Sequence, residues 1–455
     1  MNLLRLLSIP KGDAGLPRMF TVLIWILAAL LLLGGGGARL IESYERLADP
    51  ASIARASLVM QGIPAEALPV TLLDVDDKTH TVWGRTQRTP LPALAQLIEV
   101  SRTHGAAAVI VDFDLSSENV TDPADLALAA VLGNYPADAP PLLLARKISF
   151  SRAENDGPQA EGTLTTPYDA LTLGKANVRW VTTLNDVGND RQVKRIRLWQ
   201  SVCDGQGGTT YPSVALVTAG LMLPSSPGAG TLDEFLASRA NEECHGTASL
   251  PETAWPAARE ASAVLPYLLP DRVDARALFR IEHQGKPSVV LLRIPAGRLV
   301  KMEAGRASLA GEVDQEPFAG RVVLIGASHA DTGDIYPTPL GSMPGVMILA
   351  NSVVQAKAIV AKPPMQKWLS NMVLLLLFLT FAYVARKLQG APSILVIGLV
   401  SLAVLFVVSR LFGFADGIAI IGVAIPGFAL FKLFDSLVHI GMEMPHKGWR
   451  ALLKK

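Results

Sequence analysis

The distribution of apolar residues constrains this 455-residue chain more than any other feature. One apolar run extends from Met19 to Gly37, close to the roughly 20 residues that a helix needs to cross the hydrocarbon core of a bilayer. Three more runs lie near the C-terminus. We therefore predict four transmembrane helices, at residues 19–37, 366–385, 392–412 and 417–436. Residues 38–365 have ordinary globular composition and are predicted to form one domain outside the membrane.

Basic residues near the helix ends predict the orientation, because short cytoplasmic loops carry an excess of Lys and Arg. They lie in residues 1–18, in the connection that holds Arg386 and Lys387, and in residues 437–455. Four crossings then leave both termini in the cytoplasm and the large domain outside it. The basic start, the apolar stretch and small residues at 36–38 also fit a cleavable signal peptide, which would export the domain equally well.

The charge balance argues against a nucleic-acid-binding protein. The chain has 41 Lys and Arg against 40 Asp and Glu, a formal net charge of +1, whereas neutralising phosphates requires a surplus of basic residues. Only 18% of the residues are charged and 50% are apolar, as expected of a chain that lies partly in lipid.

Both cysteines, Cys203 and Cys244, fall in the predicted exported domain. An oxidising compartment permits a disulfide, and we predict one between them; the alternative is two free thiols. Their wide spacing fits no metal-site pattern.

Apolar runs alternate with helical segments in the first part of the domain. Buried strands are predicted at 70–75, 106–111 and 141–145, and helices at 91–102 and 123–131, an alternation typical of a parallel sheet. Further strands are predicted at 178–183, 193–200, 279–282, 289–293 and 321–325, and helices at 212–222 and 346–358. The segments 178–183 and 193–200 are expected to pair as a hairpin, and residues 223–262 to be irregular. The predicted fold class is an α/β domain with a mixed, partly parallel sheet, plus the four membrane helices.

Acidic residues gather where the predicted strands end. Because ligands of open α/β sheets bind at the carboxyl ends of the strands, we predict a ligand-binding site there, able to hold a hard cation or a cationic or polyhydroxylated ligand. In the alternative interpretation, each Asp caps a helix or closes a turn. The predicted ligand-binding residues are Asp74, Asp76, Asp112, Asp114, Ser328 and Asp334.

Two segments resemble catalytic motifs without completing them. Residues 111–116 (VDFDLS) are similar to the opening of haloacid-dehalogenase-type phosphatases, but no convincing basic residue or distal acidic pair follows. Residues 326–330 (GASHA) approach a nucleophile elbow, but lack the last glycine and precede a loop. We therefore predict no enzyme, no cofactor and no metal site. The histidines show no ligand spacing and are expected to be structural or solvated: His80, His104, His245, His283 and His329.

Several motifs occur in an order that identifies a family. The C-terminal set comprises residues 318–327 (FAGRVVLIGA), 333–339 (GDIYPTP), 343–346 (MPGV) and 350–351 (AN). Earlier pieces are 74–79 (DVDDKT), 105–107 (GAA), 185–186 (ND) and 211–213 (YPS). Together they closely resemble the CHASE domain of type 2, the cyclase/histidine-kinase-associated sensory extracellular domain, over residues 47–360. Residues 223–262 match no part of the pattern.

This resemblance implies a sensory module in the bacterial inner membrane, with the domain in the periplasm and a cytoplasmic output. Fewer than 20 residues follow the last predicted helix, too few for a catalytic domain. The expectation is therefore a receptor-like subunit that binds a periplasmic ligand or partner and relays its state to a separate output protein, with a homodimer as one possible assembly. The alternative is a structural scaffold or assembly subunit of a membrane complex, with the same domain as a docking platform.

Overall fold

The computed structural model describes most of the predicted exported domain and part of the C-terminal region. The described residues are 67–361, except 87, 117–122, 154–156, 165, 188–190, 205–206, 223–230, 246–260, 266, 270, 272–279 and 284, together with 367–387, 391–411, 420, 424 and 425. The chain divides into two compact units, one formed by Asp49–Pro363 and the other by Met1–Ala48 with Pro364–Lys455. The predicted spans 19–37 and most of 417–436 lie outside the described residues, as do both predicted cytoplasmic ends.

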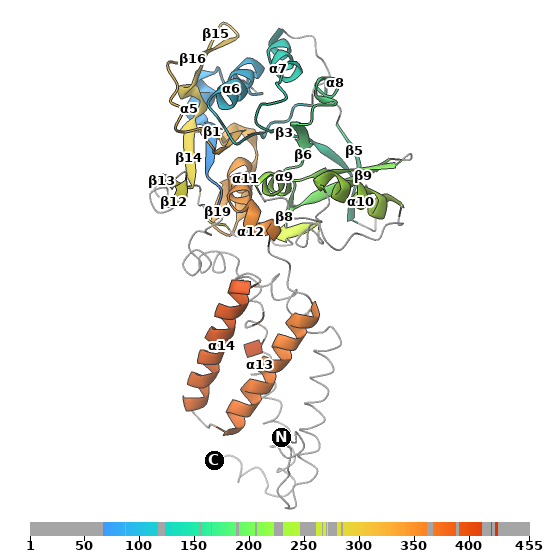
Figure 1. The fold of residues 1–455 in the computed structure, drawn as a ribbon, viewed down its shortest axis with the longest axis vertical. Coiled ribbons are helices and arrows are strands. Elements are labelled where there is room, and N and C mark those ends of the chain that lie inside the picture. The colour runs from blue at the N-terminus through green and yellow to red at the C-terminus, as the bar shows by residue number, and fades with distance from the viewer. Residues whose placement is uncertain are drawn as a thin grey trace, which may run out of the picture. The chain divides into compact units, whose positions relative to one another are not determined.

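A six-stranded sheet forms the centre of the larger unit (Figure 1). All of its neighbouring strands are parallel, and the four inner strands are apolar runs whose two faces are covered. The strands, in spatial order, are β14 (Leu291–Pro295), β1 (Val70–Val75), β17 (Val322–Ala327), β2 (Ala108–Val111), β3 (Leu142–Ala145) and β6 (Val178–Val181).

Side chains alternate between the two faces of the sheet and enter two separate cores. One core holds Leu73 and Ile325 with α6 (Leu91–Thr103) and α7 (Pro123–Gly133). The other holds Leu72 and Leu324 with α9 (Val214–Met222), α11 (Gly345–Val354) and α12 (Ala356–Ala361). The helices therefore sandwich the sheet and leave its two strand-end edges for polar residues.

Smaller elements surround this sandwich. The remaining helices are α5 (Asp77–Val82), α8 (Asp169–Thr172) and α10 (Leu232–His245), with 3-10 turns η4 (Ala296–Arg298) and η5 (Ala330–Thr332). Antiparallel pairs are β4 (Ile148–Ala153) with β5 (Gly157–Thr163), β9 (Trp199–Asp204) with β10 (Gly207–Pro212), β12 (Arg280–His283) with β13 (Lys286–Val289), β15 (Val300–Glu303) with β16 (Arg306–Leu309), and β18 (Ile335–Thr338) with β19 (Gly341–Pro344). A three-stranded sheet contains β7 (Asn185–Val187), β8 (Val193–Arg197) and β11 (Ser262–Val264).

Three predicted features are wrong in detail. The central sheet is parallel rather than mixed, because its described antiparallel neighbours form separate small sheets. The segment 178–183 does not pair with 193–200: β6 joins the central sheet beside β3, and β8 pairs with the short β7. The segment 223–262 contains the 14-residue helix α10, although few of its residues are apolar.

A disulfide fastens α10 to the β9–β10 pair, in the pairing that the sequence predicts. It joins Cys203 of β9 to Cys244 of α10, with their Cα atoms 5.4 Å apart. Gly208 lies opposite Cys203 in the β9–β10 register. A Cβ atom at Gly208 would collide with the Cys244 sulfur, so only glycine lets the helix approach this closely.

Arg321 closes the amino edge of the sheet, the edge at which its strands begin. The side chain is 3% exposed, and each of its three guanidinium nitrogens donates a hydrogen bond. Nε reaches the Thr71 hydroxyl (2.8 Å), Nη1 the Ser288 hydroxyl (2.9 Å), and Nη2 the Val70 and Val289 carbonyls (2.7 and 3.0 Å). Burial lowers the pKa of Arg321 to about 10, which still leaves it charged at neutral pH.

The second unit contains α13 (Lys367–Lys387) and α14 (Ala391–Leu411), at the positions of two predicted membrane helices. Leu374, Leu377 and Phe381 of α13 pack in a small apolar cluster with Val408 of α14. Within the part of the chain that the structure describes, no helix combines the length and apolarity needed to cross a membrane.

Candidate functional site

The candidate site is the carboxyl edge of the sheet, where β14, β1, β17, β2 and β3 end. All six predicted site residues lie on or just after these strands, except Asp334, which precedes β18. The parallel arrangement brings them to one edge, as the sequence predicts. The edge is divided into regions of different chemistry, however, and only some of its acidic groups are free to meet a ligand.

Asp74, at the end of β1, is held in an internal polar network. It is 1% exposed, and its Oδ2 accepts hydrogen bonds from Arg293 Nε (2.5 Å) and the Ser328 hydroxyl (2.9 Å). Arg293 Nη2 also donates to the Ser328 oxygen at 2.6 Å, and its Nη1 lies 3.4 Å from Asp271. Burial raises the pKa of Asp74 in spite of the opposing effect of Arg293. The other carboxylate oxygen, Oδ1, is buried without a partner among the described residues.

Asp76 and Asp114 have local structural roles. Asp76 is the N-cap of α5 and accepts a hydrogen bond from the Thr79 amide (2.8 Å). Asp114 accepts from the Ser116 amide (3.0 Å) and pairs with Lys147 (2.9 Å) near the surface. Burial alone would raise the pKa of Asp114, but hydrogen bonds from Ser116 and Lys147 outweigh it and lower the pKa. Both residues thus behave as capping and turn residues, the alternative that the sequence left open.

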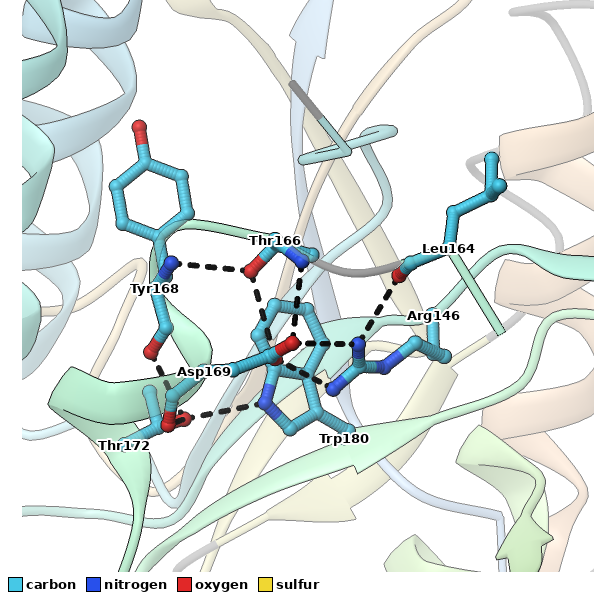
Figure 2. Close-up of polar contacts among 7 residues, drawn as sticks. All are labelled: Arg146, Leu164, Thr166, Tyr168, Asp169, Thr172 and Trp180. Atoms are coloured by element: carbon cyan, nitrogen blue, oxygen red, sulfur yellow. Dashed lines mark hydrogen bonds and ion pairs between the residues drawn. The ribbon is translucent and has the colours of Figure 1, made fainter. Parts of the chain in front are cut away.

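Arg146 closes the carboxyl edge beyond β3 (Figure 2). It forms a bidentate pair with Asp169, at 2.6 and 3.1 Å, and donates to the Leu164 carbonyl (3.1 Å). Its guanidinium carbon lies 4.2 Å from the ring centroid of Trp180, whose indole nitrogen donates to Thr172. Figure 2 shows how Asp169 is also tied to Thr166, so the whole loop is fixed on β3 and β6. Both terminal nitrogens of Arg146 are therefore engaged in internal contacts, whereas its Nε is buried without a partner among the described residues.

Asp112 and Asp334 lie on this edge without a cationic partner among the described residues, and unlike Asp76 neither of them caps a described helix. Asp112 follows β2, is half-buried, and makes no side-chain hydrogen bond with a described residue. Burial raises its pKa to about 7, and the charge of Asp334 adds to the rise. Burial and a hydrogen bond to Asp334 raise the pKa of Tyr336 to about 12. We call Asp112, Asp334 and Tyr336 the acid pocket.

The loop before β18 holds Asp334 in the acid pocket. The Asp334 amide donates to the Thr332 hydroxyl (3.1 Å), and the Asp334 carbonyl accepts from the Gly345 amide (2.8 Å). A Cβ atom at Gly345 would collide with the Asp334 carboxylate, so glycine is required where α11 begins. The glycine in the motif at 343–346 therefore has a direct part in positioning this carboxylate.

Comparison with known proteins assigns the chain to a family. The model of the CHASE2 domain matches residues 21–385. The chain belongs to the CHASE2 family. CHASE2 domains are extracytoplasmic sensory domains, and the Cys203–Cys244 disulfide is consistent with that location. No curated protein and no solved structure matches the chain.

Sequence reasoning missed three polar residues of this CHASE2 domain's carboxyl edge: Arg146, Arg293 and Tyr336. Arg146 directly follows an apolar run, so the rule that selected the aspartates would also have selected it. Arg293 interrupts the apolar segment of β14, and a charge inside a buried strand is a recognisable anomaly. Tyr336 belongs to the family motif at 333–339, but nothing in its immediate sequence indicates that it contacts an aspartate.

Proposed function

We propose that this CHASE2 protein is a membrane-anchored sensory subunit whose acid pocket binds a cationic group of a periplasmic ligand. The observation that supports this most directly is the pair Asp112 and Asp334: burial and the charge of Asp334 raise the pKa of Asp112, and no cation among the described residues pairs with either carboxylate. Both carboxylates are half-buried, and carboxylates that are partly withdrawn from water beside each other are stabilised by a proton or a cation, so a positive ligand would favour this arrangement.

The chemistry of the acid pocket favours an ammonium or guanidinium group. Such a group donates several hydrogen bonds at once, which matches two carboxylates, and the Tyr336 ring offers a polarisable face nearby. Asp74 contributes less in this proposal, because Arg293 and Ser328 already occupy one of its oxygens. The proposal contains no catalytic step.

Signal relay belongs to the same proposal. Residues 19–37, 366–385, 392–412 and 417–436 would anchor the domain, and ligand binding would shift the population of helix arrangements that a separate output protein reads. Support comes from the apolar runs of the sequence and from exposed apolar side chains on α13 and α14, such as Leu376 (59%) and Leu402 (59%). In this proposal both termini lie in the cytoplasm, and the membrane is the bacterial inner membrane.

A binding experiment on the full chain tests the acid pocket. The protein in detergent micelles is titrated calorimetrically with a panel of small amines and guanidines, together with neutral analogues of the same shape. We expect at least one cationic compound to bind, with affinity rising as the pH passes about 7 because Asp112 loses its proton. Asp112→Asn should reduce that affinity at least about tenfold, or about 1.4 kcal/mol.

The matched control is Asp114→Asn, which removes an acid two residues away that is already paired with Lys147. It should bind as the unmodified protein does. Equal loss in both variants, or binding of neutral analogues only, would contradict the proposal. Affinity purification from the native membrane tests the relay: a substoichiometric kinase or cyclase fits a sensor, whereas stoichiometric structural subunits would favour the scaffold.

A further inference from the structure

Two histidines that are 249 positions apart in the sequence lie face to face beside the carboxyl edge. His80 belongs to α5, and His329 follows β17. Their ring centroids are 3.9 Å apart and the ring planes differ by 6°. Both side chains are buried, with 8% and 6% of the residue exposed, whereas Asp331 next to them is exposed. We call His80, His329 and Asp331 the histidine cluster.

The hydrogen bonds of His80 determine which of its nitrogens is available. Nε2 lies 3.0 Å from the Thr86 carbonyl, which can only accept, so this nitrogen carries the hydrogen. In the neutral ring, Nδ1 is then an unprotonated acceptor, and it faces Asp331 Oδ2 at 3.5 Å. Two acceptors that face each other require a positive charge between or upon them.

His329 contributes a second candidate ligand atom, beside His80 and Asp331. Its Nδ1 is buried and has no partner among the described residues. One atom from each member of the histidine cluster lies within 4.8 Å of the others. Burial lowers the pKa of His329, and the adjacent His80 lowers it further. The nearby acids, Asp331 and Asp77, oppose that decrease.

The distance between His80 and Asp331 is that of two ligands in a transition-metal site. Two ligands bound at about 2.1 Å to a tetrahedral zinc ion lie about 3.4 Å apart, close to the 3.5 Å between His80 and Asp331. Two imidazoles and one carboxylate form a borderline ligand set that suits zinc or a similar divalent ion better than magnesium or calcium. An exposed carboxylate at the rim leaves the fourth position to water.

We propose that His80, His329 and Asp331 bind a zinc-class divalent ion. The ion would link the first turn after β1 to the loop after β17, where the Ala330 amide already donates to Asp77 at 3.1 Å. Because a ligand nitrogen directs its lone pair within the ring plane, binding one ion through both rings must rotate them out of their parallel stack. The loop after β17 carries both Asp331 and, three residues later, Asp334. Rotation of the His329 ring on ion binding would therefore also shift Asp334 in the acid pocket.

Calorimetry on the full chain tests the histidine cluster. The protein in detergent micelles is stripped with a chelator, dialysed and titrated with zinc chloride. We expect one high-affinity zinc ion per chain. Asp331→Asn and His329→Asn should each weaken that binding at least about tenfold. Cobalt chloride should give visible absorption bands typical of a tetrahedral ion, and both variants should lose them.

Two controls separate this site from incidental binding. His104→Asn removes a histidine that packs on Phe318, and Asp314→Asn removes an exposed carboxylate; both variants should keep the zinc ion. Asp331 is exposed, so its variant should fold even if His329→Asn does not. Zinc binding that is absent, or that is unchanged in Asp331→Asn, would overturn the proposal.

Discussion

The amino and carboxyl edges of the central sheet differ in how completely their buried polar groups are hydrogen-bonded. At the amino edge, Arg321 is surrounded by neutral acceptors, and each guanidinium nitrogen donates a hydrogen bond. At the carboxyl edge, Asp74 Oδ1 and His329 Nδ1 are buried without partners among the described residues, and Asp112 faces another acid. Unsatisfied buried groups cost stability, so their presence at the carboxyl edge, in contrast to the fully paired Arg321 at the amino edge, fits a structural role for the amino edge and the proposed binding role for the carboxyl edge.

Arg321→Met should produce the largest effect. The substitution leaves the Thr71 hydroxyl and the Val70 and Val289 carbonyls without their donor, and we expect the free energy of unfolding to fall by about 3–5 kcal/mol. Chemical unfolding of the full chain, followed by tryptophan fluorescence, measures it. Arg306→Met, at an exposed arginine, is the control. A decrease in the free energy of unfolding of less than about 1 kcal/mol would contradict a structural role for Arg321 at the amino edge.

Arg293→Met should have the next largest effect, a loss of about 2–4 kcal/mol at pH 7, because it leaves the Asp74 carboxylate buried without its cation. The pKa of Asp74 should rise further, since Arg293 is the main group that lowers it. Protonation then relieves the variant, so its difference from the unmodified protein should shrink as the pH falls. A difference that does not depend on pH would show that Arg293 acts through packing instead.

Asp112→Asn should act in the opposite direction and stabilise the protein. Because the pKa of Asp112 is raised from 3.8 to about 7, the folded chain holds this proton more tightly than the unfolded chain. Stability should therefore fall as the pH rises from about 4 to about 7, and the variant should lack that decrease. Above pH 7 we expect a gain of about 1–4 kcal/mol. Destabilisation would mean that Asp112 has a structural partner.

Asp114→Asn should have the smallest effect, within about 0.5 kcal/mol, because its ion pair with Lys147 is largely solvated. The same unfolding measurement checks it. A larger loss would show that the Ser116 turn supports the end of β2 and would weaken the distinction between Asp112 and Asp114.

The sequence predicted the elements whose pattern is strong. β1 matches its predicted bounds, and α6 begins at the predicted residue, because continuous apolar runs and helical periodicity depend only on neighbouring residues. α10 was missed because its stability comes from the disulfide and from contacts such as Trp199 with Phe235, rather than from an apolar stripe. β7, with three residues, is too short to show any pattern.

The sequence predicted the location of the site, at the carboxyl edge of the sheet, but not which of its residues are paired with one another. The rule for parallel strands placed Asp74 and Asp112 correctly at the carboxyl ends, but it could not distinguish a paired acid from an unpaired one. Arg293 is 219 residues from Asp74, and their contact depends on β14 and β17 flanking β1. The histidine cluster has the same origin, since His80 and His329 meet only after the strand order is known.

The strand order also means that β1 is synthesised well before the strands with which it pairs. β1 is the first of the described strands to be made, yet both of its partners come later, with Val70 aligned to Leu291 and Val322. At roughly 5–20 residues per second, the ribosome needs on the order of 10–50 s to supply the nearer partner. During that interval, the apolar segment of β1 lacks both of the strands that pair with it. A chaperone that binds unfolded apolar segments would have a target in β1 throughout this delay.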